Sequence, residues 1–494
     1  MSNRTTAVSP ALEEQPFSIK TIIGPVMAVV VGMIMVILDS TVVNVAMPNL
    51  IDYFDSSVTT MQWTITAYTL ALSAVIPLAG WLTDRYGAKQ IFLITIVLFT
   101  LGSVLCSLAQ TAEQLVLFRI IQGLGGGMVS PIGMAIIFRL APPGKQGAIM
   151  GVLGIPMMLG PAIGPTLSGF LVEYATWHWI FLINLPIGII ALFVGMKKLP
   201  SFERKEVPKL DKAGMVLAPI TFATLAYAVS EGGEDWGSTE TLIALIVGGV
   251  ALILFIIAEL RHQQPLLELR VFKSSDFTRG ILVSWLSTMA LFGSFLFVPM
   301  YLQLVKGFTP MQAGVLSIPQ VIMSGLFMPL GGKLFDKFGA RVLAIVGIGF
   351  IAGGLFLLSQ VAAATAGWYV IASLMLMGAG MGLSMMPVNT HILKAAPRKL
   401  VSRVTSLTTA AQQVVVSFAI AGLSGYFASR TTHYMMSANG DGAGAMSSAF
   451  GDTFFFAAFL AVAGALLAIV LRRPKAEEAG EQPEAQASMA TMGH

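Results

Sequence analysis

The amino-acid sequence predicts an all-α membrane protein in which fourteen helices cross the bilayer. The first observation behind this prediction is composition. Of 494 residues, 55% are hydrophobic and only 11% are charged, whereas a soluble globular chain carries about 25% charged residues. A chain this poor in charge could not cover its own surface in water. A single soluble core is excluded as well, because such cores stop growing near ~250–300 residues.

The second observation is the spacing of the apolar segments. A hydrocarbon core about 30 Å thick is crossed by roughly 20 apolar residues in helical form, and fourteen segments of the chain qualify. They lie at about 24–47, 62–83, 90–109, 115–138, 147–172, 178–197, 212–230, 240–260, 278–304, 311–332, 341–361, 367–390, 404–428 and 451–471. An even number of spans places both chain ends on one side of the membrane.

The third observation is the sidedness of positive charge. When the loops are assigned alternately to two sides, nearly all Lys and Arg residues fall on the side of the termini, and the opposite side receives only Lys306 and Arg430. By the positive-inside rule, the basic side is cytoplasmic. We therefore expect a multi-pass protein of the cell inner (cytoplasmic) membrane with both termini in the cytoplasm. The N-terminal residues lack the cationic segment and cleavage site of a signal peptide, so the first span is expected to stay in place.

An internal repeat organises the spans. The run G-W-L-T-D-R-Y-G-A-K at Gly80–Lys89 recurs in register as G-K-L-F-D-K-F-G-A-R at Gly332–Arg341, and G-G-G-M at Gly125–Met128 is echoed by G-A-G-M at Gly378–Met381. Chance similarity between short loops is the alternative explanation. Parallel repeats of six helices occur in transporters, whose substrate site lies near the membrane midplane between the halves.

The repeat sets the expected domain organisation. We expect a six-helix half at 1–200, a linker with two additional central helices at 201–270, a second six-helix half at 271–472, and a disordered cytoplasmic tail at 473–494, which is poor in apolar residues.

Three further motifs carry a resemblance to a known family. They are L-x-x-x-R-x-x-Q-G-x-G-G-G at Leu115–Gly127, L-G-P-A-I-G-P-T-L-S-G at Leu159–Gly169 and Q-W-T-I-T-A-Y at Gln62–Tyr68. Together with the repeated loops, they resemble the major facilitator superfamily, and most closely its fourteen-helix drug:proton antiporter family. Pro165 and Ser168 depart from the glycines that many antiporters carry in the fifth-span motif. The resemblance implies proton-coupled efflux of lipophilic, in particular cationic, drugs from the cytoplasm by alternating access.

Asp39 is a carboxylic acid near the middle of the first span. At ~1.5 Å per residue it lies about 14 Å from Pro48, the expected outer end. An isolated charge at this depth costs somewhere between ~2.5 and ~17 kcal/mol, so it is expected to face a wet cavity or a partner. Burial favours the neutral acid and a nearby cation favours the carboxylate, so the group could take up and release a proton. Fixing a neighbouring helix is the alternative role.

Arg119 is the only basic residue deep within an expected span. It lies about 12 Å from Thr111, at a depth similar to that of Asp39. A guanidinium stays ionised and needs an acceptor, so Asp39 or carbonyls of the first span are the expected partners. The second half carries apolar residues at the aligned position, which favours a function over a scaffold role. The resemblance links both residues to proton coupling.

The loop after the second span is expected to act as a conformational gate. Glycine permits a tight connection and close helix approach, and the resemblance implies that the aspartate faces a helix start of the other half, here near Arg403. The gate residues are Gly80, Asp84, Arg85 and Gly87, with Asp336 as the copy in the second half. A role of Arg85 in membrane orientation only is the alternative.

The fifth span carries a glycine–proline run. Proline bends a helix and glycine permits close contact, and the resemblance identifies the run as the antiporter motif, typical of exporters. Its residues are Gly160, Pro161, Gly164 and Pro165. A packing kink without directional meaning is the alternative.

Polar residues of the spans are candidates for the substrate cavity. They are Asn44, Gln62, Tyr68, Gln122, Asn184, Gln303, Asn389 and Gln412. Intramembrane amides often only join helices, so each is weak alone. The 28 Met and 30 Phe residues suit a soft pocket for dissimilar apolar guests, although most of them would simply face lipid.

Other functional classes are disfavoured. The glycine run at Gly123–Gly127 lies inside a span without a preceding strand or a following Lys-Ser/Thr pair, so we expect no nucleotide and no ATP-driven transport. No metal-ligand cluster or catalytic set is evident, so no cofactor and no enzyme activity are expected. The net charge of +4 is too small to suggest a nucleic-acid partner. The expected partners are small lipophilic substrates, protons and the lipid bilayer. Alternatives are an exporter of one metabolite or antibiotic, a proton-coupled nutrient symporter, and a non-transporting sensor or scaffold.

Overall fold

The fold is taken from a computed structural model. It describes residues 19–142, 145–151, 164, 167–168, 170–171, 174–202, 212–232, 237–262, 265–362, 364–397, 400–437 and 442–472. Within these residues the regular elements are all helical. They are α1 (Ile19–Phe54), α2 (Val58–Val75), α3 (Leu78–Tyr86), α4 (Ala88–Ser107), α5 (Ala112–Leu140), α7 (His178–Leu182), α8 (Asn184–Lys198), α9 (Lys212–Gly232), α10 (Thr239–Arg261), the short 3₁₀ helix η1 (Leu269–Lys273), α11 (Ser275–Leu304), α12 (Pro310–Phe338), α13 (Ala340–Ser359), α14 (Gly367–Lys394), α15 (Val401–Ser437) and α16 (Gly442–Ala468).

The helices bear out an all-α membrane protein. Eleven helices of the described residues are long and apolar enough to cross a bilayer, or twelve if α2 and α3 form one bent span. A shorter apolar helix, Ala213–Val229, matches the expected seventh span. Most of the expected fifth span, 147–172, lies outside the described residues. A total of fourteen spans therefore stays a prediction.

One expected span is bent in the structure, and another carries a one-residue interruption. The span expected at 62–83 bends by 52° between α2 and α3. The break falls at Ile76 and Pro77, where proline has no backbone N–H to continue the ladder. The span expected at 178–197 is divided into α7 and α8 at Ile183.

The last two spans are longer than the sequence predicts. The region from 431 to 448 reads as a polar outer loop, yet α15 continues to Ser437 and α16 begins at Gly442. Side chains tie the two helices together there, since Arg430 Nε donates to Asp452 Oδ2 at 2.5 Å and the Tyr434 hydroxyl donates to the same oxygen at 2.9 Å. These contacts favour continued helix over an open loop.

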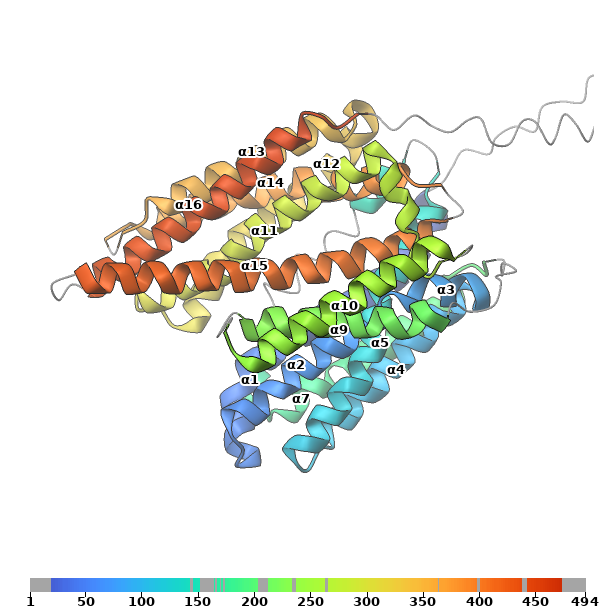
Figure 1. The fold of residues 1–494 in the computed structure, drawn as a ribbon, viewed down its shortest axis with the longest axis horizontal. Helices are drawn as coiled ribbons and strands as arrows, with labels where there is room; N and C mark the ends of the chain where they lie inside the picture. The colour runs from blue at the N-terminus through green and yellow to red at the C-terminus, as the bar shows by residue number, and fades with distance from the viewer. Residues whose placement is uncertain are drawn as a thin grey trace, which may run out of the picture.

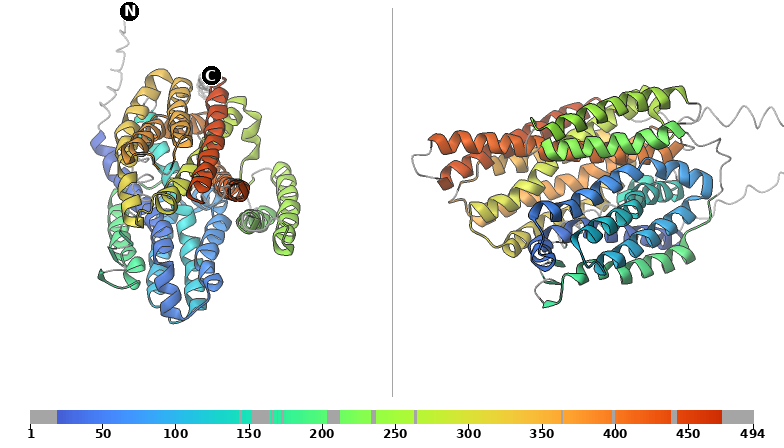
Figure 2. Two further views of the ribbon diagram at one scale, coloured as in Figure 1. Left: turned by 90° about the vertical axis from the view of Figure 1, so that its left-hand side faces the viewer. Right: turned by 60° about the horizontal axis from the view of Figure 1, so that its bottom comes forward.

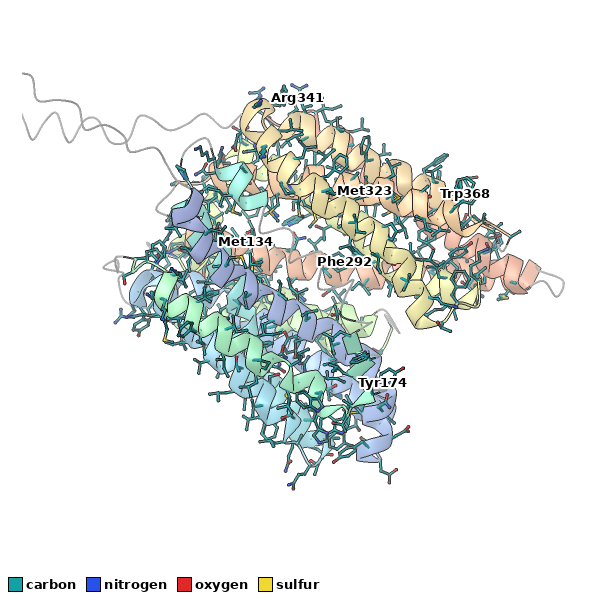
Figure 3. All side chains as sticks on the ribbon, turned by 180° about the vertical axis from the view of Figure 1, so that it is seen from behind. Met134, Tyr174, Phe292, Met323, Arg341 and Trp368 are labelled. Atoms are coloured by element: carbon teal, nitrogen blue, oxygen red, sulfur yellow. The ribbon has the colours of Figure 1, made fainter. Side chains whose placement is uncertain are left out.

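The helices form two groups. Figure 1 shows α1 to α8 gathered in a first group and α11 to α16 in a second. Corresponding pairs pack in each: α5 lies against α2 and α4, and α14 lies against α12 and α13. The groups meet where α15 contacts α3 and α5. In the second group Arg341 lies at this end and Trp368 at the opposite end (Figure 3).

Glycines explain the close packing within each group. A Cβ on Gly125 would lie 2.5 Å from the backbone nitrogen of Phe99 on α4, and one on Gly127 would lie 2.5 Å from the carbonyl oxygen of Leu72 on α2. In the second group, Gly378 and Gly380 meet backbone carbonyls of α12 and α13 in the same manner. The repeated glycine motifs therefore serve helix contact.

The additional helices α9 and α10 form a pair at the periphery (Figure 2). Helix α9 contacts α2 of the first group and α15 of the second, and Trp63 stacks on Tyr227 with ring centroids 6.0 Å apart. Helix α10 packs on α9, and its outer face exposes large apolar residues such as Ile246 and Ile253, as suits lipid.

Candidate functional site

Asp39 and Arg119 form a buried ion pair inside the first group. Arg119 Nη1 of α5 donates to Asp39 Oδ2 of α1 at 2.6 Å, and the side chains are 1% and 0% exposed. The equal depths predicted from sequence thus correspond to direct contact. A buried ion pair is costly unless its remaining polar groups are also satisfied.

Two amides complete the coordination of the Asp39 carboxylate. Gln122 Nε2 of α5 donates to Oδ1 at 2.8 Å, and Asn184 Nδ2 of α8 donates to the same oxygen at 2.9 Å. All three of these partners donate, so the arrangement suits the ionised acid. The Ser103 hydroxyl of α4 accepts from both amides, at 3.1 and 2.9 Å, and donates to the Phe181 carbonyl at 2.9 Å.

Arg119 uses further faces of its guanidinium. Nε donates to the Thr64 carbonyl of α2 at 3.1 Å, Nη1 also donates to Gln122 Oε1 at 2.7 Å, and the group lies 3.8 Å from the ring centre of Tyr68. Together with the two amides and Ser103, the pair therefore joins α1, α2, α4, α5 and α8. We call Asp39, Arg119, Gln122, Asn184 and Ser103 the Asp39 network.

The sequence did not point to Ser103 or to the Thr64 carbonyl. Serine in an apolar span is common, and a backbone carbonyl leaves no mark in sequence. The available clue to Ser103 was depth, but only a coarse one, since it lies in the outer half of α4, four residues before the helix ends at Ser107.

A second cluster lies where the two groups meet, which we call the gate end. Asp84 of α3 is 2% exposed as a side chain and approaches two arginines, with Oδ1 3.3 Å from Arg139 Nη2 and Oδ2 3.6 Å from Arg403 Nε. Arg403 belongs to the first turn of α15, in the second group. Arg139 also donates to the Ser402 hydroxyl of that turn. The sequence assigned Arg139 only to membrane orientation.

Glycine allows α3 to approach this turn. A Cβ on Gly80 would lie 2.9 Å from the Cα of Arg403. Gly87, which ends α3, has φ 95°, and Gly339 at the matching point of the second group has φ 78°, a region that favours glycine. Arg85 is exposed and lies over the rings of Trp81 and Tyr86 of its own helix.

Asp336 makes the reciprocal contact. Its Oδ1 accepts from the Gly147 N–H and its Oδ2 from the Ala148 N–H, both at 3.2 Å, at the start of the helical segment 146–151 of the first half. A carboxylate suits a helix N-terminus because unpaired N–H groups gather there. Lys394 Nζ lies 3.9 Å from Oδ1. Each copy of the repeated loop thus binds the other half at the gate end.

A pocket lies between the groups, next to the gate end. It is lined by Ser130, Met134, Ile281, Ser284, Ser287, Thr288, Leu291, Ser384, Met385, Val388, Asn389, Ile392, Thr408, Thr409 and Gln412, from α5, α11, α14 and α15. It contains about 850 Å³ of empty space, including space open to the exterior. Met134 on α5 faces the second group (Figure 3).

The predicted cavity residues separate into four sets. Asn389 and Gln412 line this pocket. Gln122, Asn184 and Tyr68 contact or surround the ion pair instead. Gln62 is exposed, and the Gln303 amide donates to the Pro299 carbonyl of its own helix at 3.2 Å. Asn44 lies in α1, but its side chain is outside the described residues.

The antiporter motif is described only at its edge. Gly160, Pro161 and Pro165 lie outside the described residues, whereas a Cβ on Gly164 would collide with the Thr41 hydroxyl. Ser168, which departs from the family's glycine, donates to the Val42 carbonyl at 2.7 Å. The motif segment therefore contacts α1 within three residues of Asp39.

No group of three or more His, Cys, Asp or Glu side chains that could hold a metal ion occurs among the described residues. Among those residues, the buried carboxylates of Asp39 and Asp84 are paired with arginines instead.

Comparisons with known proteins agree with this architecture. A family model described as Major Facilitator Superfamily matches residues 29–420. The chain is 37% identical to the "Multidrug resistance protein B homolog" of Mycobacterium tuberculosis over 390 residues, 78% of this chain and 72% of the relative. It is 32% identical to the "Lincomycin resistance protein LmrB" of Listeria monocytogenes over 440 residues, 88% and 93% of the two chains.

Solved structures show the same fold. The proton:xylose symporter XylE bound to a bromo-deoxyglucose aligns with a TM-score of 0.64 at 16% identity, covering 93% of this chain and 98% of that one. The human organic anion transporter MFSD10 aligns with a TM-score of 0.62 at 15% identity, covering 89% and 99%. The chain therefore belongs to the major facilitator superfamily, as a multi-pass membrane transporter related to multidrug resistance proteins.

Proposed function

We propose that this transporter exports lipophilic drugs from the cytoplasm by proton-coupled alternating access. The observation that carries the proposal is the course of α5. This one helix bears Arg119 of the Asp39 network, Ser130 and Met134 of the pocket, and Arg139 of the gate cluster. If α5 shifts along its axis or rotates about it when Arg119 moves, the pocket residues and the gate residue on the same helix move as well.

Protonation of Asp39 supplies a reason for such movement. The carboxylate accepts from Arg119, Gln122 and Asn184. A proton on Asp39 removes the negative charge that balances the guanidinium and replaces an acceptor with a donor. Leaving a buried charge without its partner costs about 3–5 kcal/mol. That amount is enough to shift a two-state equilibrium by about two to three and a half powers of ten, since each 1.4 kcal/mol is a factor of about ten.

The gate contacts define what the shift would change. Asp84 and Asp336 each bind the opposite half at one end of the molecule. If the positive-inside orientation holds, this end is cytoplasmic and the present conformation is closed on that side. Export then requires a second conformation in which the gate contacts break and the pocket opens to the cytoplasm.

Direct capture of a cationic drug by Asp39 is not favoured in this conformation, because Arg119 already occupies the carboxylate. Competition between proton and drug would act instead through the two conformations, because the proton favours one conformation and the drug favours the other. A nutrient symporter shares the fold, and the direction of transport distinguishes the two. Export of a single metabolite or antibiotic is the other alternative, and a substrate panel distinguishes it.

The test is gradient-driven transport in proteoliposomes. Asp39→Asn is expected to abolish transport driven by an imposed pH gradient, because the amide cannot carry the proton. Asp52→Asn, which changes an exposed carboxylate of the same helix, is the control and should retain it. Full gradient-driven export by Asp39→Asn would refute the proton role, and accumulation in the opposite direction would favour a symporter.

A further inference from the structure

The chemistry of the pocket bears on the class of cargo. Among its lining residues none is acidic or basic, whereas nine carry a hydroxyl or an amide. The remaining six are aliphatic or Met side chains. A ligand of complementary chemistry has an apolar body and several hydrogen-bonding groups.

Several of the polar groups are available to a ligand. Within the described residues no hydrogen bond engages the side chains of Ser130, Ser284 or Asn389, which come from α5, α11 and α14. Gln412 Nε2 of α15 donates to the Thr288 hydroxyl at 2.5 Å, which leaves its amide oxygen to accept. Thr409 donates to the Thr405 carbonyl of its own helix and so presents oxygen lone pairs. Donors and acceptors are thus offered from four helices.

The surrounding charge does not favour a cation. Among the described spans, the carboxylate nearest mid-membrane depth is Asp39, which is paired with Arg119 and fully buried. At the gate end beside the pocket, the one carboxylate of Asp84 faces two guanidiniums, those of Arg139 and Arg403. A permanent cation in this pocket would lose hydration without gaining a counter-charge, which is a large cost.

We propose that the pocket selects uncharged amphiphilic cargo bearing several hydroxyl or amide groups, and that it discriminates against permanent cations. The proposal rests on the proposed export function and favours uncharged drugs over the cationic drugs expected from the resemblance. Asn389 and Gln412 are the specificity-determining residues, because their amides offer both donors and acceptors. If the cargo is uncharged, the net charge that crosses the membrane in each transport cycle is carried by the proton alone.

Binding to the purified full-length protein tests the proposal. Uncharged probes with two hydroxyls and an amide (chloramphenicol and thiamphenicol) are compared with permanent cations (tetraphenylphosphonium and ethidium). We expect the uncharged probes to bind at least about tenfold more tightly than the cations. Asn389→Ala should weaken their binding roughly three- to tenfold, as loss of one or two hydrogen bonds predicts.

A gain-of-function variant provides a sharper arm. Gln412→Glu keeps the shape of the side chain and installs a carboxylate, so tetraphenylphosphonium should bind at least about tenfold more tightly than to the wild type. Gln413→Glu is the matched control, because its position is adjacent and outside the pocket lining, and it should show no such gain. Gained affinity cannot arise from misfolding.

Three results would overturn the proposal: tighter binding of the cations to the wild type, no binding of either uncharged probe, or equal gains in the two glutamate variants. Failure of the proposed function looks different. In that case neither probe class moves across proteoliposomes under a pH gradient, whatever the binding pattern.

Discussion

Arg119 is held by acceptors of three chemical kinds. It donates to the Asp39 carboxylate, the Gln122 amide oxygen and the Thr64 backbone carbonyl, and its guanidinium faces the Tyr68 ring at 3.8 Å. A planar guanidinium with five donors can serve all of these together, whereas an ammonium is a compact point charge. The identity of this side chain therefore matters beyond its charge.

We predict that Arg119→Lys lowers gradient-driven export at least about tenfold while preserving expression and folding. The lysine keeps the charge that balances Asp39, but it cannot maintain the fork-like contacts to Gln122 and Thr64. Arg430→Lys is the control, because Arg430 forms an ion pair with Asp452 that is about one-third exposed. Transport rates of the two variants in proteoliposomes provide the measurement, and an unimpaired Arg119→Lys would show that charge alone suffices.

At the scale of single residues, the depth of a side chain in the membrane could be predicted, but the side of the helix on which it lies could not. Counting residues from the expected span ends placed Asp39 and Arg119 at one level, and they are in contact. The same arithmetic did not give the rotation of each helix about its axis, and therefore not which neighbour a side chain faces. Gln122 and Asn184 were accordingly expected at a cavity. They bind Asp39 instead. Helix rotation depends on how the glycines of α5 fit α2 and α4, which requires the packed structure.

Helix α12 carries the gate contact of the second group in its last turns. Gly332 lies against the backbone of Gly147, so any side chain at this position meets the first half directly. Gly325, two turns earlier on the same helix, has nothing within 4 Å of an added Cβ. The two glycines thus separate the effect of a larger residue on gate closure from its effect on the helix itself.

We predict that Gly332→Val prevents closure at the gate end and slows export at least about tenfold. The added methyl groups overlap a backbone carbonyl, and overpacking of this kind costs typically 1–3 kcal/mol in the closed conformation alone. Gly325→Val should transport at near wild-type rate, since the same helix-propensity change is introduced without a clash. Equal loss in both variants would attribute the effect to the helix rather than to the gate.

The length of the apolar segments predicted which parts of the chain form membrane spans. The points at which helices break or end depended on other interactions. The bend between α2 and α3 follows from Pro77, which the sequence displays, although proline inside α5 and α11 leaves those helices unbroken. The extension of α15 and α16 depends on the contact of Arg430 with Asp452. That contact joins residues 22 positions apart and has no periodic signature in the sequence.

The whole molecule combines two groups that contact at one end with a peripheral helix pair that touches both. The internal repeat is visible in the sequence as two copies of the same loop motif. It therefore predicted two groups with matching gate loops. The place of α9 could not be predicted, because its apolar faces look alike without their neighbours. Its contacts with α2 and α15 mean that any rocking of the groups must change the packing of α9 on at least one of them.

The gate contacts join the two groups at one end of the molecule, so access to the pocket is expected from the opposite face, which a cysteine can report. Thr409 lines the pocket, and the single native cysteine, Cys106, is buried and need not be removed. We predict that Thr409→Cys reacts with a membrane-impermeant thiol reagent at least about tenfold faster from the outer face of intact cells than from the cytoplasmic face of inverted vesicles.

Combining Thr409→Cys with Gly332→Val should reverse this preference, because the gate end can no longer close and the population moves to the opposite conformation. Adding Gly325→Val instead should leave the outer preference intact. A preference for the cytoplasmic face in Thr409→Cys alone would mean that the basic loops, and with them the gate end, lie outside. Equal reaction from both faces in every variant would contradict a gate at the contacts of Asp84 and Asp336, and with it alternating access through this pocket.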